Sequence, residues 1–559
     1  MPGIRICRSV LSGTSMNRPL PFTVLRRGSR ATSVIFPRGE RHTSSKSALQ
    51  IAGENQKPHL SFRSLIEVLR DQHDLADIKS PISPDLDVAA VTRRVYETRS
   101  PAPLFHNVTG IDPKTGLFKI LGAPVGLRKD QHERHGRLAI QLGLKRSSTP
   151  REIVEKLIEA RYAKHLPPVP IDAPAAAPCK QNILHGDQID FNKWPIPRLH
   201  AKDGGNYLGS YGFHIVRSPD QSWTSWSISR TMHIAGEPRR LTAPVMSGQH
   251  LAQVRQMWID KGAQETPWAM VFGGPPAAAF VGGMPLPSFV SEDGYIGALS
   301  GCPMEVVKCE TNDLYVPANA EVILEGRLSN SKTAPEGPMG EYHGYSFDDA
   351  PIQEPVFEVD CVTYRDDPII PICVAGKPAD ETHTVWGTSI SAELLAALRE
   401  GDFPVDFVWL PFEASAVWIV VSVDIEKLAK TKMSASELSR RAGELIFKTH
   451  AGWEAPKIFL VGNDVDITDI HQFVWAFATR YRPGAGEFLF DDAQGIPMVP
   501  YMTRAERDGD ISDAGQGGRS VINLLLPSEY EGKRTWWASD FDSSFPADVK
   551  ERAVAKMVY

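Results

Sequence analysis

The chain has 559 residues, of which 42% are hydrophobic and 23% charged, and its formal net charge at pH 7 is −6. A chain of this length buries a large core and is expected to hold about three domains. The weak acidic balance does not indicate nucleic-acid binding, and the longest apolar runs, such as residues 416–421, are far shorter than the ~20 residues that span a bilayer. The six cysteines form no C-x-x-C pair, which favours free thiols in a reducing compartment over a disulfide framework.

The N-terminal segment differs in composition from the rest. Seven arginines and no acidic residue precede Glu40, and they are interleaved with Ser, Thr and apolar residues. This composition is typical of a mitochondrial transit peptide, and the continuous apolar stretch of a secretory signal is absent. A disordered basic tail, or a true start at Met16 or later, is the alternative. We therefore leave residues 1–55 out of the fold argument.

Three segments with different patterns follow. Ser61 precedes Phe62, Leu65, Ile66 and Leu69, which predicts a capped amphipathic helix at the start of a mixed domain. Proline-rich residues 166–178 mark a connector. Residues 205–375 alternate short β-rich runs, such as 211–216 and 321–325, with Gly and Pro, which predicts a β-barrel or sandwich with inserted helices. Beyond 385, expected helices at 392–399 and 436–447 alternate with expected strands at 417–423 and 457–461, as in an α/β domain. We place the domains at 56–178, 179–378 and 379–559.

Residues 335–345 place two carboxylates, Glu336 and Glu341, in a segment too rich in Gly and Pro for a helix. If this loop is buried, desolvation favours the neutral form of a carboxyl group, whereas a neighbouring cation favours the charged form. The two glutamates could thus take different roles. The alternative is a surface loop with two solvated carboxylates.

Two further stretches carry candidate site residues. Residues 223–230 alternate polar and bulky side chains, so a strand would place Trp226, Ile228 and Arg230 on one face. A buried arginine needs an anionic partner such as Glu336, Glu341, a phosphate or a substrate carboxylate, although an edge-strand arginine in water is the plainer interpretation. His250 lies in the first turn of an expected helix, where backbone N–H groups attract anions; it is otherwise an ordinary polar residue. The motifs G-x-G-x-x-G, G-x-x-x-x-G-K-[ST], G-x-S-x-G and H-E-x-x-H are absent.

Together these stretches resemble the UbiD family of decarboxylases, and within it the fungal ferulic acid decarboxylases. The resemblance runs in order from about Ser61 to Trp537. Its motifs are Trp226-Ser227-Ile228-x-Arg230, Gln249-His250, Met284-Pro285 through Glu292, Leu314-Tyr315-Val316-Pro317-Ala318, Glu336-Gly337-Pro338-x-Gly340-Glu341-x-His343-Gly344-Tyr345, Asp380-Glu381-Thr382-His383-Thr384 and Trp475-Ala476-Phe477-x-Thr479-Arg480.

The resemblance implies an α/β (α+β) protein with an N-terminal mixed domain, a central split β-barrel that binds the cofactor, and a C-terminal α/β domain that forms a homodimer. It also implies prenylated FMN, supplied by a separate flavin prenyltransferase and held with a manganese-type divalent ion and potassium. The implied reaction is non-oxidative decarboxylation of α,β-unsaturated acids of the cinnamic, coumaric, ferulic or sorbic type, giving a terminal alkene and CO2. A decarboxylase of aromatic or heteroaromatic acids, and a catalytically idle flavin-binding relative, are the alternatives.

The family pattern also assigns roles to individual residues. Glu341 is the expected general acid, Arg230 holds the substrate carboxylate, and Glu336 orients Arg230. The implied divalent ligands are Ser225, His250 and Glu292, and the implied potassium contacts are Trp226, Val281, Met284 and Glu292. The expected cofactor-binding residues are Ser225, Trp226, Ser227, Ile228, Ser229, Arg230, Gln249, His250, Met284, Glu292 and His450. The expected substrate pocket consists of Met246, Tyr342, Thr382, Trp386 and Ile496.

The chain departs from the family pattern in three places. Ser225 replaces the usual Asn and would be a weaker metal ligand. His450 replaces a phosphate-facing lysine, and Lys448 would share its face if that stretch were extended. Trp386 and its neighbours in the pocket are bulkier than in ferulate-type relatives, so the reaction class is better defined than the substrate.

Overall fold

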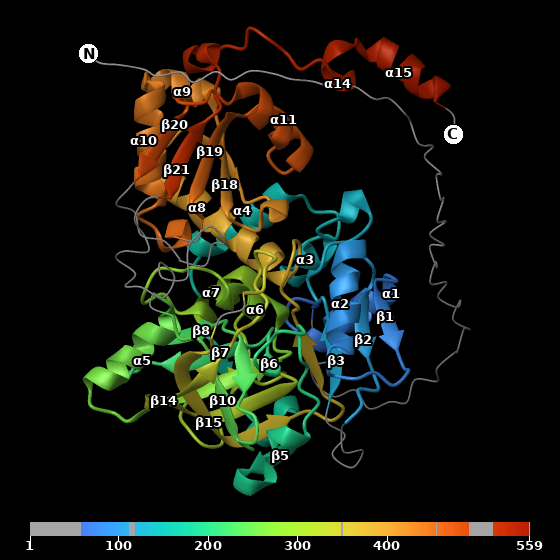
Figure 1. Ribbon diagram of the computed structural model, residues 1–559, viewed down its shortest axis with the longest axis vertical. Coiled ribbons are helices and arrows are strands. Elements are labelled where there is room, and N and C mark those ends of the chain that lie inside the picture. Colours follow the sequence, from blue (N-terminus) through green and yellow to red (C-terminus); the bar gives the residue numbers. More distant parts are fainter. Residues whose placement is uncertain are drawn as a thin grey trace, which may run out of the picture. The chain divides into compact units, whose positions relative to one another are not determined.

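A computed structural model describes residues 57–110, 118–246, 248–347, 350–453, 455–490 and 518–557 (Figure 1). The predicted transit segment and Ile496 lie outside these ranges. Residues 51–559 form one compact unit, to which all that follows refers.

The first sheet combines strands from two parts of the chain. Its order is β1 (Leu75–Ile78), β2 (Ala102–Phe105), β3 (Lys119–Gly122) and β16 (Ile369–Ile372), the last of which comes from the end of the central segment. Helices α1 (Phe62–Asp71), α2 (Asp87–Thr98) and α3 (Gly136–Gln141) belong to the same region. Ser61 caps α1 as predicted, with its hydroxyl 3.3 Å from the Ser64 amide, and Phe62, Leu65, Ile66 and Leu69 are buried.

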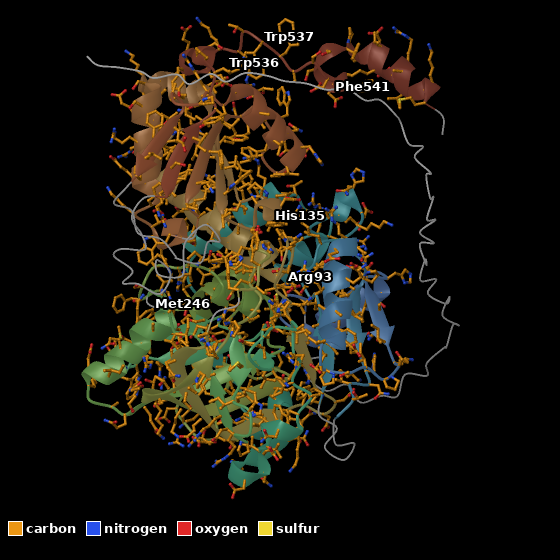
Figure 2. The ribbon with its side chains drawn as sticks, in the orientation of Figure 1. Arg93, His135, Met246, Trp536, Trp537 and Phe541 are labelled. Atoms are coloured by element: carbon orange, nitrogen blue, oxygen red, sulfur yellow. The ribbon has the colours of Figure 1, made fainter. Side chains whose placement is uncertain are left out.

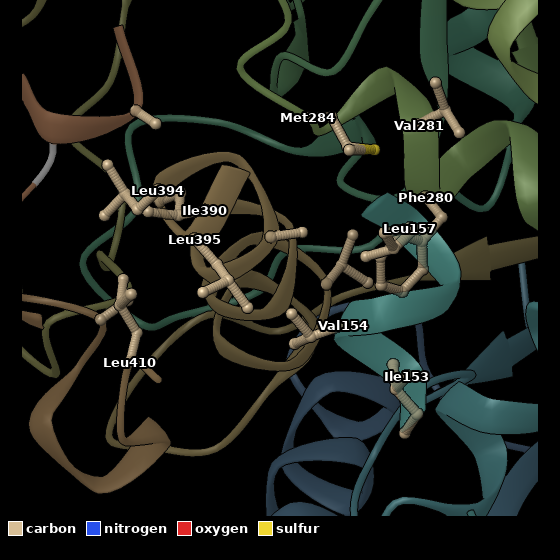
Figure 3. Close-up of a cluster of buried hydrophobic side chains, with 14 of the residues drawn as sticks. Ile153, Val154, Leu157, Phe280, Val281, Met284, Ile390, Leu394, Leu395 and Leu410 are labelled. Atoms are coloured by element: carbon tan, nitrogen blue, oxygen red, sulfur yellow. The ribbon is translucent and has the colours of Figure 1, made fainter. Parts of the chain in front are cut away.

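Helix α4 (Pro150–Tyr162) ties the N-terminal region to the other domains. It starts with a capping box between Thr149 and Glu152. Its buried face, including Val154 and Leu157, packs between α8 (Thr388–Glu400) and the helices α6 (Pro276–Gly282) and α7 (Glu292–Ser300) (Figure 3). A short three-stranded sheet of β4 (Val169–Pro170), β12 (Glu305–Lys308) and β13 (Tyr315–Pro317) follows the connector.

The central region is a nine-stranded curled sheet that forms a half-barrel, which confirms the predicted split barrel. Its order is β6 (Tyr207–Gly209), β9 (Thr231–His233), β10 (Arg240–Thr242), β15 (Ile352–Tyr364), β14 (Val322–Glu336), β11 (Glu265–Phe272), β7 (Phe213–Arg217) and β8 (Thr224–Ser227), with β5 (Asn182–His185) beside β15. Two irregularities between β14 and β15 increase the bend of these long strands. The inserted helices are α5 (His250–Asp260), α6 and α7.

The C-terminal region is the predicted α/β domain. Its sheet has the order β17 (Val405–Trp409), β18 (Trp418–Val423), β19 (Lys457–Gly462), β21 (Arg519–Asn523) and β20 (Glu487–Phe490). Strands β18, β19 and β21 are parallel, whereas β17 and β20 pair antiparallel at the edges. Helices α10 (Ala435–Ile446) and α11 (Ile470–Arg480) lie on opposite sides of it (Figure 1). Helices α9 (Ile425–Thr431), α14 (Phe541–Ser544) and α15 (Ala547–Lys556) complete the described chain.

No helix in the described ranges combines the length and hydrophobicity needed to cross a membrane. The five described cysteines are all free thiols.

Candidate active site

A cavity of about 290 Å³ lies at the half-barrel and is also lined by residues of the C-terminal region. The predicted site residues that line it are Ser227, Ile228, Ser229, Arg230, Met246, Gln249, His250, Met284, Glu292, Glu341, Tyr342, Thr382, Trp386 and His450. The predicted residues Ser225, Trp226, Val281 and Glu336 are buried behind this wall. The structure therefore gathers most of the predicted site around one space.

Arg230 lies between the two glutamates. Its Nε and Nη2 each donate to Glu336 at 2.9 Å, and its Nη1 donates to Glu341. Glu336 is 2% exposed and also accepts a hydrogen bond from the Tyr207 hydroxyl at 2.9 Å. Burial alone would lower the pKa of Arg230, but the two carboxyl groups hold this pKa well above its usual value. Glu336 thus fixes a permanently charged guanidinium whose remaining edge faces Glu341 and the cavity.

Glu341 lies at the start of a tight turn. Its amide donates to the Tyr345 carbonyl at 2.9 Å, and its own carbonyl accepts from the Gly344 amide at 3.0 Å. Burial raises the pKa of the Glu341 carboxyl, and the neighbouring Arg230 only partly offsets this effect. Glu336, which we expected in the same loop, is instead the last residue of β14, because residues 333–336 pair with β15. The two carboxyl groups therefore differ in environment as predicted, one paired on a strand and one in a turn.

The predicted alternation of residues 223–230 holds only to Ser227, where β8 ends. Beyond that residue the prediction is wrong, because the Ile228 amide leaves the sheet and donates to the Gly282 carbonyl at 3.1 Å. The Ser229 hydroxyl then donates to the Pro244 carbonyl at 2.8 Å. As a result Ser227, Ile228, Ser229 and Arg230 all line the cavity rather than alternating between two faces.

His250 and Glu292 form a buried pair at the first residues of α5 and α7. The His250 Nδ1 lies 2.6 Å from a Glu292 oxygen, and the other Glu292 oxygen accepts the Trp226 amide at 3.0 Å. The His250 Nε2 is buried without a hydrogen-bond partner among the described residues, so it can bind an added group. Ser225 does not line the cavity, and its hydroxyl pairs with Ser227 at 2.9 Å. The described residues contain no cluster of three or more His, Cys, Asp or Glu side chains that could hold a metal ion.

His450 reaches the cavity from the short helix η8 (His450–Trp453). Burial and the nearby His250 lower the pKa of its imidazole. Lys448 is exposed and does not line the cavity. The expectation that Lys448 shares a face with His450 is therefore wrong, because the chain turns into a helix there instead of extending.

Two aromatic side chains, Tyr342 and Trp386, form part of the cavity wall. The Tyr342 and Trp386 rings meet edge to face, with centroids 5.3 Å apart and planes at 86°. Trp386 and Thr382 belong to η6 (Thr382–Gly387), a π-helical turn that leads into α8. Met246 also lines this space, whereas the predicted neighbour Ile496 lies outside the described residues.

Sequence analysis missed four polar residues of the wall, namely Ser210, Tyr211, Cys373 and Glu381. Glu381 is 2% exposed, accepts the Val125 amide at 2.9 Å and bonds to the Tyr96 hydroxyl. Burial raises its pKa to about 7. The Tyr211 hydroxyl is buried with no partner among the described residues. Glu381 stands in the motif with Thr382, but nothing in the sequence shows that its carboxyl group is desolvated.

A charged guanidinium between two carboxyl groups, in an aromatic-walled cavity, is typical of an enzyme that acts on a small organic acid. The chain belongs to the UbiD family of carboxy-lyases. Residues 66–157, 172–378 and 383–524 match the N-terminal, Rift-related and C-terminal domains of 3-octaprenyl-4-hydroxybenzoate carboxy-lyase.

Individual relatives are similar over nearly the whole chain. Pyrrole-2-carboxylic acid decarboxylase of Pseudomonas aeruginosa is 45% identical over 88% of this chain and 96% of its own. Ferulic acid decarboxylase 1 of Saccharomyces cerevisiae is 38% identical over 89% of this chain and 97% of its own. Among solved structures, the UbiD-class enzyme HmfF from Pelotomaculum thermopropionicum in complex with FMN is 25% identical, with a TM-score of 0.71 over 89% of this chain and 100% of that one.

Proposed function

We propose that the protein is a prenylated-FMN-dependent, non-oxidative decarboxylase of planar aromatic or conjugated acids. The observation that carries this proposal is Arg230, held by Glu336 and facing Glu341 inside the cavity. A substrate carboxylate takes the edge of Arg230 that faces Glu341 and the cavity, and the conjugated part of the substrate lies against Tyr342 and Trp386. The arrangement provides an anion site and a proton donor side by side.

Each residue then has one step to perform. Arg230 orients the carboxylate, and breaking the C–C bond releases CO2 and leaves an electron pair on the substrate carbon. The prenylated flavin supplies the electron sink for this pair when it is bound. Glu341 transfers its proton to that carbon and is reprotonated from solvent, so one proton is consumed per turnover. Glu336 keeps Arg230 in place through its two hydrogen bonds.

The residues of the cavity suit a phosphorylated flavin with its ions. The unpartnered His250 Nε2 and the neighbouring Glu292 carboxylate would offer an imidazole and a carboxylate to a divalent ion held with the cofactor. We propose a manganese-type ion there, with Ser225 as a weak third ligand, and potassium near Trp226, Val281, Met284 and Glu292. His450 takes the phosphate-facing place. The complexes of HmfF with FMN and, in an evolved dimeric form, with prFMN support the choice of cofactor.

For the substrate, we propose first a small heteroaromatic acid such as pyrrole-2-carboxylate. Two observations favour this substrate. The relative named for this activity is 45% identical, and the edge-to-face pair of Tyr342 and Trp386 narrows the cavity in which the substrate would lie. The second candidate is an α,β-unsaturated acid of the cinnamic, ferulic or sorbic type. It is favoured by ferulic acid decarboxylases of two yeasts, which are 38% and 37% identical.

Co-expression with a flavin prenyltransferase, followed by a substrate panel, tests the proposal. We expect flavin absorbance in the purified protein and CO2 release from pyrrole-2-carboxylate, with slower or no release from cinnamate and sorbate. The reverse order would select the second candidate. A protein that binds flavin but releases no CO2 from any acid of the panel would be an idle relative, and the proposal would fail.

We also propose a homodimer and a mitochondrial location. The described C-terminal end exposes Trp537, Phe541 and Phe545 at 76%, 43% and 50%, which is unusual for a monomer surface (Figure 2). Light scattering of the purified protein tests the dimer. The arginine-rich segment before Glu40 supports import, and fusing residues 1–55 to a fluorescent protein tests it.

A further inference from the structure

We propose that His383 is a positioning residue for Glu341. Its imidazole fixes the backbone of the turn from which Glu341 reaches Arg230, and this inference rests on the acid role proposed for Glu341. His383 does not line the cavity and is fully buried, so it acts only through its hydrogen bonds.

Both ring nitrogens of His383 are engaged with backbone groups. The Nδ1 accepts the Asp380 amide at 3.0 Å and lies 3.2 Å from an Asp380 carboxylate oxygen. Because a carbonyl can only accept a hydrogen bond, the ring presents an N–H at Nε2 to Tyr342. The Nε2 then donates to the Tyr342 carbonyl at 2.8 Å. Tyr342 directly follows Glu341, so this bond holds the peptide next to the proton donor.

The Asp380 end of this chain is itself rigid. The Asp380 carboxylate accepts the amides of Gly376 and Thr382 at 3.0 Å each and lies 3.4 Å from Arg93. Arg93, which belongs to α2, also donates to the carbonyls of Val374 at 3.0 Å and Lys377 at 2.5 Å (Figure 2). Arg93 of the N-terminal region thus fixes Asp380, and His383 links Asp380 to the Tyr342 carbonyl next to Glu341.

A second anchor holds the same loop before Glu341. The Gly340 amide donates to Asp203 at 3.0 Å, and the Pro338 carbonyl accepts the Gly204 amide at 2.8 Å. A side chain at Gly340 would lie only 2.6 Å from the His200 ring, so the backbone is packed tightly there. Glu341 is thus placed by two anchors, Asp203 on one side and His383 on the other. Loss of the His383 bond frees only the second side.

The same histidine also aligns the aromatic wall. It lies within η6, the turn that carries Trp386, and Trp386 meets the Tyr342 ring. The bond from His383 to Tyr342 therefore fixes the wall and the acid relative to each other. Because a displacement of about 1 Å can cost about 100-fold in rate, its loss should lower kcat more than it changes KM.

Two amide substitutions separate the two hydrogen bonds of His383. His383→Gln extends its amide nitrogen to about the place of Nε2 and keeps a donor for the Tyr342 carbonyl. His383→Asn reaches only the place of Nδ1 and keeps an acceptor for the Asp380 amide. In the cofactor-loaded enzyme we expect His383→Asn to lower kcat about 10- to 100-fold with KM changed less than about threefold, and His383→Gln to recover most of kcat. Both should retain the flavin absorbance.

The outcomes are distinguishable. An inactive wild-type protein contradicts the proposed function and not the contacts of His383. An active wild type with equal kcat for the two variants overturns the positioning role. If His383→Asn does not fold, Arg93→Gln replaces it, because it loosens Asp380 from outside the cavity; we expect about a 3- to 10-fold loss of kcat with KM unchanged. An unaltered kcat in Arg93→Gln then refutes the inference.

Discussion

The substitution Glu341→Gln should separate substrate binding from turnover. With Glu341 ionised, the cluster of Arg230, Glu336 and Glu341 carries a net charge of −1 and disfavours an anionic substrate. With Glu341 protonated, the Arg230–Glu336 pair is neutral and can accept a carboxylate. Glutamine keeps a group that can contact Arg230, removes the charge and cannot donate a proton as an acid does. We therefore expect tighter binding and little catalysis.

The charges of the site set the expected changes in substrate affinity and in kcat for Glu341→Gln. Two like charges about 5 Å apart at an effective dielectric constant of about 20 repel by about 3 kcal/mol, which sets the upper limit of the gain in affinity. Burial raises the pKa of Glu341, so the repulsion is absent below that pKa and grows as the pH rises through it. In the wild type, substrate affinity and proton donation should both fall with rising pH. Loss of the acid should lower kcat by about 10²- to 10⁴-fold.

Two measurements on cofactor-loaded protein test this reasoning. Stopped-flow or steady-state CO2 release gives kcat, and titration with a non-reactive aromatic carboxylate over a series of pH values gives the affinity. Glu341→Asp is the matched control, because it keeps the acid on a shorter side chain. An unchanged kcat in Glu341→Gln would refute the acid role. A pH-dependent affinity that persists in Glu341→Gln would refute the charge argument.

Three further predictions concern two residues of the cavity wall and the buried Ser225 behind it. Trp386→Ile should enlarge the cavity and raise kcat/KM for cinnamate relative to pyrrole-2-carboxylate by about tenfold or more, since one fitted hydrophobic contact is worth about 1–3 kcal/mol. An unchanged ratio of the two kcat/KM values in a two-substrate competition would contradict this prediction. The pKa of Glu381 is raised from 4.5 to about 7, so its stabilising contribution is complete below about pH 4.5 and is lost as the pH rises through about 7. At about 1.4 kcal/mol per pKa unit the loss is at most about 3.5 kcal/mol. Denaturant unfolding at pH 5.5 and 8 should show a smaller pH dependence in Glu381→Gln than in the wild type. Ser225→Asn should increase the manganese retained after dialysis, measured by elemental analysis, because an amide carbonyl reaches further than a hydroxyl; equal metal content would exclude position 225 as a ligand.

The sequence predicted the local elements and the residue types of the site better than their geometry. The capped helix at Ser61 and the α/β order beyond residue 385 are confirmed because both depend on short-range patterns. The pairing of Arg230 with Glu336 was implied by the family resemblance, and Glu341 was one of the anionic partners that a buried arginine could take. The end of β8 at Ser227 was not expected, because it depends on a hydrogen bond to the Gly282 carbonyl, which is distant in sequence. The sequence also did not predict that β16 joins the first sheet, because this depends on its pairing with β3, about 250 residues earlier in the chain.

The roles of Glu381 and Asp380 could not be predicted either, because their contacts also join residues that are distant in sequence. Both are short-range neighbours of Thr382 in sequence, but their partners, Tyr96 and Arg93, lie on α2 almost 300 residues earlier. Through these contacts one helix of the N-terminal region holds one carboxyl group of the cavity wall and the aspartate that supports His383. The N-terminal region thus acts on the site without lining it. Residues of α2 therefore position groups of the site, although no side chain of α2 lines the cavity.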